Sequence, residues 1–146
     1  MLKHELLHPQ INAALGRAGH SAKVLIADGN FPASSACGPK AEVVSLNLSP
    51  GVVNAAQVLR AIVSAVPIER ADVMMYHTEG PFAQPCEPPV WAEFRRIIGD
   101  AGLALELTTI ERFEFYRTVS LPDHVLTIQT AEQQKFGNIL LTIGVR

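Results

Sequence analysis

Hydrophobic residues along this chain recur at two spacings, and these spacings predict alternating helices and strands. Apolar residues repeat at intervals of three and four over 9–18, which predicts a helix that begins at Pro9 and ends at Gly19. The unbroken apolar run over 23–27 predicts a buried strand.

The same alternation continues toward the C-terminus. Further strands are expected at 42–48, 72–77, 103–108, 125–129 and 139–143, and further helices at 52–66, 91–98 and 110–119. Helices that alternate with strands are typical of a layered α/β fold with a largely parallel sheet. We therefore expect residues 1–146 to form a single domain with three α/β/α layers and a central, mostly parallel six-stranded sheet. The last two strands can also pair antiparallel.

Composition narrows the class of protein. Of the 146 residues, 48% are hydrophobic and 18% are charged, which suits either a buried parallel sheet or a large subunit interface. The formal net charge is −2 and no basic stripe is present, so nucleic acid is not an expected partner. Every apolar stretch is shorter than the length that spans a bilayer, about 18 to 20 residues. No signal-peptide pattern is present. Cys37 and Cys86 form no CxxC pair, which indicates reduced thiols and a cytoplasmic protein without a membrane partner.

Two short motifs suggest metal or nucleotide chemistry, and neither is in a suitable context. The segment from His4 to His8 reads HExxH, whose two histidines bind zinc only when they lie one helical turn apart. Pro9 follows directly and moves His8 out of helical geometry. Gly16 and Gly19 follow a helix rather than a strand, so they do not predict a dinucleotide-binding loop. We therefore expect no metal and no cofactor.

Two polar residues flank the first buried strand, and each allows a structural or a functional interpretation. Asp28 directly follows the strand, where open α/β sheets bind ligands, but an aspartate there also begins turns. His20 precedes the strand and is either a surface or capping residue or an acid–base group. His77 and His124 have no evident partner in the sequence and are expected to be structural.

Two later segments mix aromatic and polar residues. Residues 111–116, Glu-Arg-Phe-Glu-Phe-Tyr, fit an amphipathic helix with an aromatic core face. Residues 136–138, Phe-Gly-Asn, precede the last strand, and their structural interpretation is a loop with a positive φ at Gly137.

Together these segments resemble the family of sugar mutarotases that comprises fucose mutarotase and ribose pyranase. The resemblance covers nearly the whole chain. It is carried, in order, by Leu-x-x-x-Gly-His ending at His20, Asp-Gly-Asn-Phe-Pro at 28–32, Arg-Phe-x-Phe-Tyr at 112–116, and Phe-Gly-Asn-Ile-Leu-Leu at 136–141 with Gly-Val at 144–145.

The resemblance implies a role for each motif. His20 takes the place of the family's proton donor, and Asp28 takes that of a sugar-binding aspartate. Arg112 corresponds to an arginine that contacts the substrate in the fucose branch, where the ribose branch has a histidine. The other implied sugar-binding residues are Tyr116, Phe136, Gly137 and Asn138. The family usually has a tyrosine at position 136, and the motif suggests that Tyr116 supplies a hydroxyl instead.

The activity that the resemblance implies is the interconversion of the α and β anomers of L-fucose or a related sugar. One proton leaves the anomeric hydroxyl and another reaches the ring oxygen, so that the ring opens to the aldehyde and closes again. Positioned acid–base groups suffice for these steps. Two alternatives remain open. One is a D-ribose pyranase, which Arg112 disfavours, and the other is a noncatalytic sugar-binding oligomer, because Phe136 lacks the hydroxyl.

The spacing of His20 and Asp28 bears on the assembly. They flank a strand, and eight residues at ~3.3 Å each would separate them by up to about 26 Å, too far for one monosaccharide to touch both. We therefore expect sites at subunit boundaries, with His20 from one chain and Asp28 from its neighbour. The resemblance likewise implies a ring-like homo-oligomer, with decamers among the family's assemblies.

Overall fold

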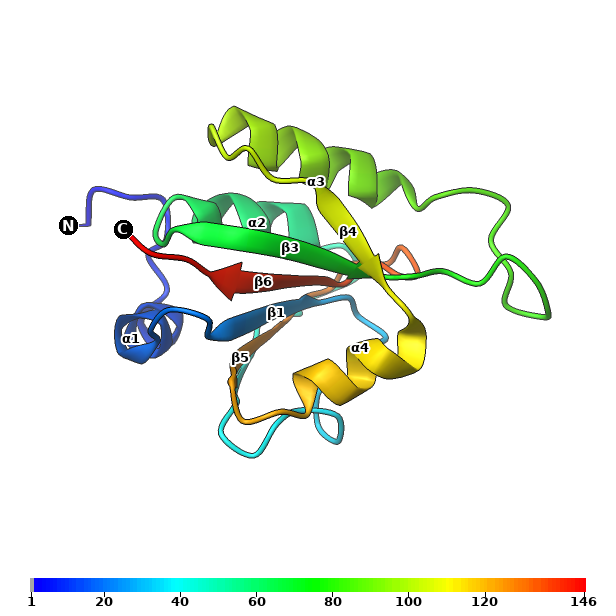
Figure 1. Cartoon of the computed structure of the whole chain (residues 1–146), viewed down its shortest axis with the longest axis horizontal. Helices are drawn as coiled ribbons and strands as arrows, with labels where there is room; N and C mark the ends of the chain where they lie inside the picture. The colour runs from blue at the N-terminus through cyan, green and yellow to red at the C-terminus, as the bar shows by residue number, and fades with distance from the viewer. Residues whose placement is uncertain (1) are drawn as a thin grey trace.

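The computed structural model describes residues 2–146, which form one six-stranded sheet with helices on both faces (Figure 1). The elements in chain order are α1 (Pro9–Arg17), β1 (Lys23–Ala27), β2 (Glu42–Ser45), α2 (Ala55–Val63), β3 (Ile68–Met74), α3 (Pro89–Asp100), β4 (Leu107–Ile110), α4 (Arg112–Val119), β5 (His124–Gln129) and β6 (Ile139–Ile143). The strands lie in the order β2-β5-β1-β6-β3-β4.

All strands of the sheet except β6 run in the same direction. β1 pairs parallel with β5, β5 with β2, and β3 with β4, whereas β6 pairs antiparallel with both β1 and β3. The prediction of a mostly parallel six-stranded sheet in an α/β fold is confirmed.

The last two strands do not pair with each other, so the antiparallel pairing considered from the sequence is wrong. β1 lies between β5 and β6. Its residues 24–27 are buried, so it takes a central place with a strand on each side. The 130–138 connection passes around the end of β1, where Thr130 N donates to Ala27 O at 3.0 Å and Gly29 N donates to Glu132 O at 2.8 Å.

The bounds of three strands differ clearly from those that the hydrophobic pattern predicts. β2 ends at Ser45 rather than at residue 48. β3 begins at Ile68 rather than at residue 72, because β6 offers pairing partners to Ile68 and Arg70. β4 spans Leu107–Ile110 rather than 103–108, in register with the second half of β3. Because β3 already ends at Met74, His77 lies in the loop that follows it.

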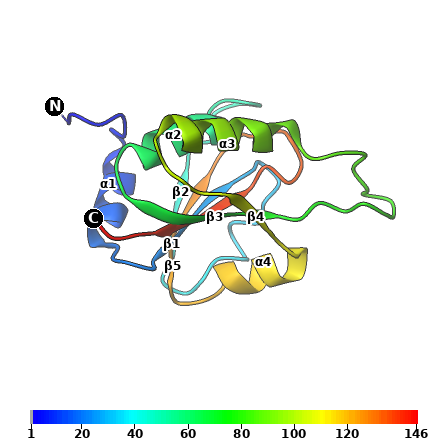
Figure 2. The same ribbon diagram turned by 45° about the horizontal axis from the view of Figure 1, so that its top comes forward.

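Three helices cover one face of the sheet, and α4 covers the other (Figure 2). The side chains of β1 alternate between the two faces. Val24 and Ile26 belong to the larger core with α1, α2 and α3, whereas Leu25 and Ala27 pack with Phe115 of α4. The α/β/α layers predicted from the sequence are therefore present. No helix within residues 2–146 is long and apolar enough to cross a membrane.

His8 begins helix α1 as its capping residue. Its backbone is extended, with φ −61° and ψ 119°, and its Nδ1 accepts a hydrogen bond from Ile11 N at 3.4 Å. The geometric reason for rejecting the HExxH motif, that Pro9 keeps His8 out of the helix, is confirmed.

The reversed direction of β6 decides which segments meet. The carboxyl ends of parallel strands lie at one edge of a sheet, and an antiparallel strand has its amino end at that edge. The residues that follow β1, β3 and β4 therefore converge with those that precede β6.

His124, at the start of β5, is fully buried with both ring nitrogens close to backbone carbonyls. Nδ1 lies 2.6 Å from Val119 O, and Nε2 lies 3.0 Å from Leu126 O. Burial lowers the pKa of His124 because it disfavours the imidazolium, while these carbonyls and Asp123 act in the opposite direction.

We expect the free energy of unfolding to fall as the pH drops below about 6.5, the ordinary pKa of histidine. The unfolded chain binds the His124 proton more readily than the folded chain, so acid favours unfolding, by up to about 1.4 kcal/mol per pH unit. Urea unfolding of the wild type and of a His124→Gln variant between pH 5 and 8 measures this contribution. A constant difference between the two proteins across that range would contradict it.

Candidate functional site

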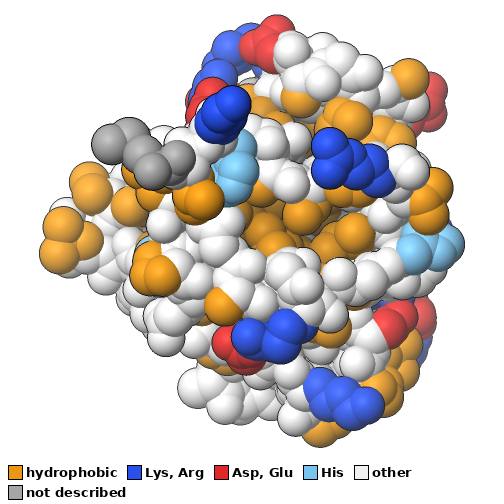
Figure 3. All heavy atoms as spheres, turned by 90° about the vertical axis from the view of Figure 1, so that its left-hand side faces the viewer, with side chains coloured by type: hydrophobic (Ala, Val, Ile, Leu, Met, Phe, Trp, Pro, Cys, Tyr) orange, Lys and Arg blue, Asp and Glu red, His pale blue; other side chains and the backbone are white. Residues whose placement is uncertain are grey.

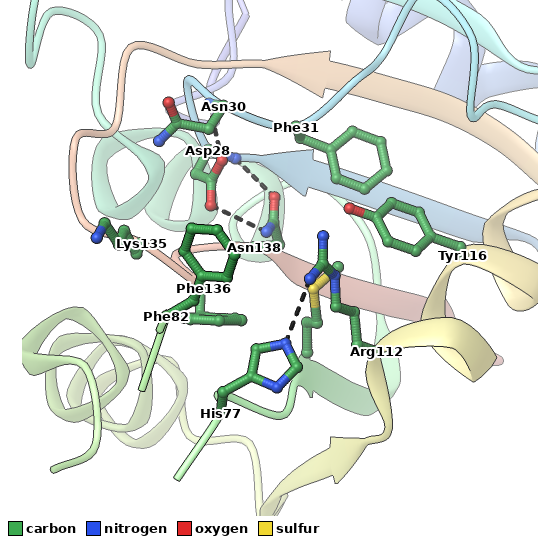
Figure 4. A pocket seen from close by; sticks show the side chains of 11 residues that line it. Asp28, Asn30, Phe31, His77, Phe82, Arg112, Tyr116, Lys135, Phe136 and Asn138 are labelled. Atoms are coloured by element: carbon green, nitrogen blue, oxygen red, sulfur yellow. Dashed lines mark hydrogen bonds between the residues drawn. The ribbon is translucent and has the colours of Figure 1, made fainter. Parts of the chain in front are cut away.

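A cavity of ≈ 310 Å³ opens at the edge of the sheet where β1, β3 and β4 end and β6 begins (Figure 4). Its volume falls within the range of ligand pockets. The cavity is lined by Asp28, Asn30, Phe31, Met74, His77, Phe82, Arg112, Tyr116, Lys135, Phe136 and Asn138.

Asp28, directly after β1, is held in place by Asn138, directly before β6. Asn138 Oδ1 accepts from Asp28 N at 2.8 Å, and Asn138 Nδ2 donates to Asp28 Oδ2 at 3.0 Å. Asn30 N donates to the other carboxylate oxygen, Oδ1, at 2.9 Å, and Gln129 Nε2 donates to Asp28 O at 2.6 Å. The turn that the sequence allowed is present, and the carboxylate also lines the cavity.

The environment of Asp28 has opposing effects on its charge. The side chain is only 3% exposed, and this burial raises the pKa of the Asp28 carboxyl above its ordinary value of 3.8. The backbone amides of Asn30, Gly137 and Phe31 and the Asn138 side chain oppose the rise, because they stabilise the carboxylate. The carboxylate therefore has several donors although it lies in a buried position.

The segment 136–138 packs tightly against the residues just before it, and this packing requires a glycine at position 137. A Cβ on Gly137 would lie 2.9 Å from Gln134 O and 2.9 Å from Glu132 Cγ. The positive φ predicted at Gly137 is found instead at Phe136, with φ 60°. This conformation is uncommon for a bulky residue. The indole Nε1 of Trp91 donates to Phe136 O at 2.9 Å and helps to hold it.

The opposite wall of the cavity comes from α4 and from the loop after β3. Arg112 is the first residue of α4, and Tyr116 lies one turn later on the same side of the helix. The guanidinium of Arg112 lies 5.9 Å from the centre of the Tyr116 ring, and its Nη1 lies 3.3 Å from His77 Nε2. The Tyr116 hydroxyl points into the cavity, toward Asp28 and Asn138 (Figure 4).

Aromatic rings form the apolar part of the lining. Phe31 stacks on Tyr116 with ring centres 5.7 Å apart, and Phe136 meets His77 edge to face at 5.8 Å. Phe82, at the mouth of the cavity, is 65% exposed. Such a lining, with a few placed polar groups, suits a small molecule that has both hydroxyl groups and carbon–hydrogen faces.

His20 does not line this cavity. It lies before β1, at the opposite edge of the sheet, where its Nε2 is 3.0 Å from Glu69 Oε2. Its side chain is 55% exposed. Figure 3 shows this end of the molecule, where hydrophobic side chains gather in a hollow among polar and charged ones. The chain therefore presents Asp28 at one end and His20 at the other.

Comparisons with known proteins bear directly on this arrangement. The family model described as "RbsD / FucU transport protein family" matches residues 1–146. Human fucose mutarotase is 33% identical over 146 residues, which cover 96% of this chain and 90% of the human protein. The chain belongs to the RbsD / FucU family.

Both branches of the family are found among the proteins similar to this chain. The D-ribose pyranase of Pseudomonas putida (strain W619) is 29% identical over 145 residues, which cover 99% of this chain and 98% of that protein. The crystal structure of a fucose mutarotase in complex with L-fucose from Streptococcus pneumoniae has a TM-score of 0.81 at 22% identity, covering 99% of each chain. That structural match supports the fold of the family.

The cavity contains five of the seven residues implicated by the resemblance. Asp28, Arg112, Tyr116, Phe136 and Asn138 line it. The other two, Gly137 and His20, do not. Gly137 lies next to Asp28, where its missing Cβ avoids a clash with Gln134 O and Glu132 Cγ, whereas His20 is at the far edge.

Several lining residues were missed from the sequence. His77 was expected to be structural, and the predicted strand over 72–77 hid its place in a loop at the sheet edge. Phe31 follows Asp28 in the Asp-Gly-Asn-Phe-Pro motif and could have been found there. Nothing in the local pattern around Met74, Phe82 or Lys135 indicates the cavity. Glu69, the partner of His20, is likewise visible only in the structure.

We expect the Asp28 carboxyl to titrate above 3.8, and the replacement Asn138→Ala to raise its pKa further. This replacement removes a side-chain donor that stabilises the carboxylate. Asn30→Ala is the matched control, because Asn30 donates through its backbone amide, which the replacement retains. Carboxyl ¹³C NMR titrations of the three proteins measure the midpoints. An equal midpoint in the wild type and Asn138→Ala would contradict the assigned role of Asn138.

Proposed function

We propose that this protein is a cofactor-free mutarotase that interconverts the anomers of a free monosaccharide, L-fucose or a related sugar. The observation that carries the proposal is the convergence of Asp28, Arg112, Tyr116 and Asn138 in one cavity of a chain 33% identical to human fucose mutarotase. Its reaction class is isomerisation.

The cavity residues suit the binding of a sugar. Asp28 accepts hydrogen bonds from sugar hydroxyls, and Arg112 and Asn138 donate them. Tyr116 both donates and accepts through its hydroxyl, and Phe136 covers an apolar face of the ring. These contacts hold the sugar while protons move at the anomeric hydroxyl and the ring oxygen.

We assign the acid–base role to His20 of a neighbouring subunit. Its exposed imidazole beside Glu69 is available to another chain, and its position at the far edge of the sheet is consistent with a shared site. A carboxylate next to an imidazole forms a hydrogen bond with one ring nitrogen and so orients the ring. Glu69 is therefore suited to support proton transfer by His20.

A shared site of this kind requires a contact between the two different ends of the subunit. Such head-to-tail contacts close into rings when the rotation between subunits permits. Exposed apolar residues are present at both ends, with Phe82 and Phe113 near the cavity and Leu7 and Val145 near the termini. We propose a ring-shaped homo-oligomer, with a decamer as one such assembly. The free thiol of the exposed Cys86 suits the cytoplasm.

Saturation-transfer NMR of sugar anomers at equilibrium tests the activity. We expect the wild type to accelerate anomer exchange of L-fucose or a relative, and His20→Ala to lower the rate roughly 10²- to 10⁴-fold by removing the acid–base group. His4→Ala is the matched control and should leave the rate unchanged. The panel includes fucose, ribose, rhamnose and galactose.

The outcomes of this panel separate the candidate activities. Faster pyranose–furanose exchange of ribose, without an effect on fucose anomers, would indicate a ribose pyranase. Sugar binding without exchange of any sugar would indicate a noncatalytic binding protein, and both results would refute the proposed activity.

Mixing two inactive variants tests the shared site. In a His20→Ala and Asp28→Ala mixture, sites that take His20 from one variant and Asp28 from the other are intact. Random exchange of subunits at equal amounts should restore about one quarter of the wild-type activity for such head-to-tail sites. Mass spectrometry verifies that the oligomers are mixed. Verified mixed oligomers without recovered activity would refute the shared site.

A further inference from the structure

Arg112 occupies a position that the stability of its helix does not explain. It is the first residue of α4, where the helix dipole disfavours a cation. The helix is capped by its neighbour Glu111, whose Oε2 accepts from Phe113 N at 2.9 Å and from Glu114 N at 3.0 Å. The guanidinium is therefore placed for the cavity rather than for the helix.

The Arg112 side chain contacts an imidazole and an aromatic ring rather than a carboxylate. Its Nη1 lies 3.3 Å from His77 Nε2, and its guanidinium lies 5.9 Å from the centre of the Tyr116 ring. Within residues 2–146, no carboxylate forms an ion pair with it. Because a guanidinium has no acceptor, Nη1 donates and His77 Nε2 accepts. The hydrogen of the neutral His77 ring is then on Nδ1.

His77 is itself held on two sides. Its ring meets the Phe136 ring edge to face at 5.8 Å, and its backbone carbonyl accepts from Gln84 N at 2.7 Å. The His77 and Arg112 side chains point toward one another at the wall of the cavity (Figure 4). A fixed imidazole therefore presents the one hydrogen-bond acceptor that the Arg112 side chain has within residues 2–146.

Because the partner of Arg112 is an imidazole, most of the N–H donors of the guanidinium remain available. A guanidinium has five N–H donors, and a bidentate carboxylate occupies two of them and neutralises the charge. One neutral ring nitrogen occupies a single donor and leaves the charge intact. Four donors then remain for hydroxyl groups in the cavity.

We propose that His77 is a positioning residue that fixes Arg112 through one hydrogen bond and leaves its remaining donors to bind the hydroxyls of the sugar. This role rests on the proposed function, because it assigns how that same site recognises a monosaccharide. His77 acts through Arg112 and does not take part in the proton transfers.

Three separate substitutions at position 77 test whether His77 positions Arg112. His77→Ala removes the acceptor and should raise KM for the best sugar about tenfold, with kcat changed less than threefold. His77→Gln retains an acceptor oxygen and should restore KM to within about threefold of the wild type. His77→Glu offers a carboxylate that occupies two donors, so its KM should exceed that of His77→Gln. A His77→Gln variant no better than His77→Ala would overturn the proposal.

A double-mutant cycle tests whether His77 acts through Arg112. In an Arg112→Ala background, the further replacement His77→Ala should change KM less than twofold, because no guanidinium remains to be positioned. An equal effect in both backgrounds would overturn the proposal. Thermal unfolding of each variant identifies any that fail to fold, and Arg117→Ala serves as an exposed control on the same helix.

The contact can also be measured without a substrate. Side-chain ¹⁵N NMR of the wild type should show slowed rotation of the Arg112 guanidinium, and His77→Ala should release it. If no sugar shows accelerated exchange in the wild type, the proposed function fails while this experiment still decides whether His77 holds Arg112. An unchanged Arg112 signal in His77→Ala would refute the positioning role alone.

Discussion

The reversed strand β6 is the constraint on which the site depends. It runs antiparallel between β1 and β3, so the residues that precede it reach the same edge as those that follow the parallel strands. Asn138 then forms reciprocal hydrogen bonds with the backbone amide and the carboxylate of Asp28. A parallel β6 would place Asn138 at the other edge, and Asp28 would lose both contacts. The absence of a Cβ at Gly137 avoids a clash with Gln134 O and Glu132 Cγ in the loop that leads to Asn138.

The sheet also separates two groups that the proposed chemistry needs together. Asp28 follows β1 and His20 precedes it, so the length of the strand lies between them. Loops at the two edges cannot bring these residues to one sugar within a subunit without disrupting the buried strand. Contact between the cavity end of one chain and the His20 end of another is the simplest arrangement that unites them. The buried strand that stabilises the fold is therefore also the reason why we propose a shared site.

Features that depend on neighbouring residues could be predicted from the sequence, whereas features that depend on strand pairing could not. Asp28 could be placed because an apolar strand ends there, and the motif around Asn138 identified that residue together with Phe136. His77 was missed because apolar residues before it suggested a strand through residue 77, whereas pairing with β6 shifts β3 toward its N-terminus. The positive φ belongs to Phe136 rather than Gly137, since the glycine is needed for space and not for backbone freedom.

The sequence by itself determined the class of fold, the alternation of helices and strands, and the motifs that implicate the site, because these depend on local periodicity and on residue types at short spacing. Only the tertiary structure decided that β1 separates the last two strands, that His77 contacts Arg112, and that His20 lies beside Glu69 away from the cavity. These features depend on strand order and on contacts between distant segments. No local pattern specifies them, because each one brings together residues that lie far apart in the sequence.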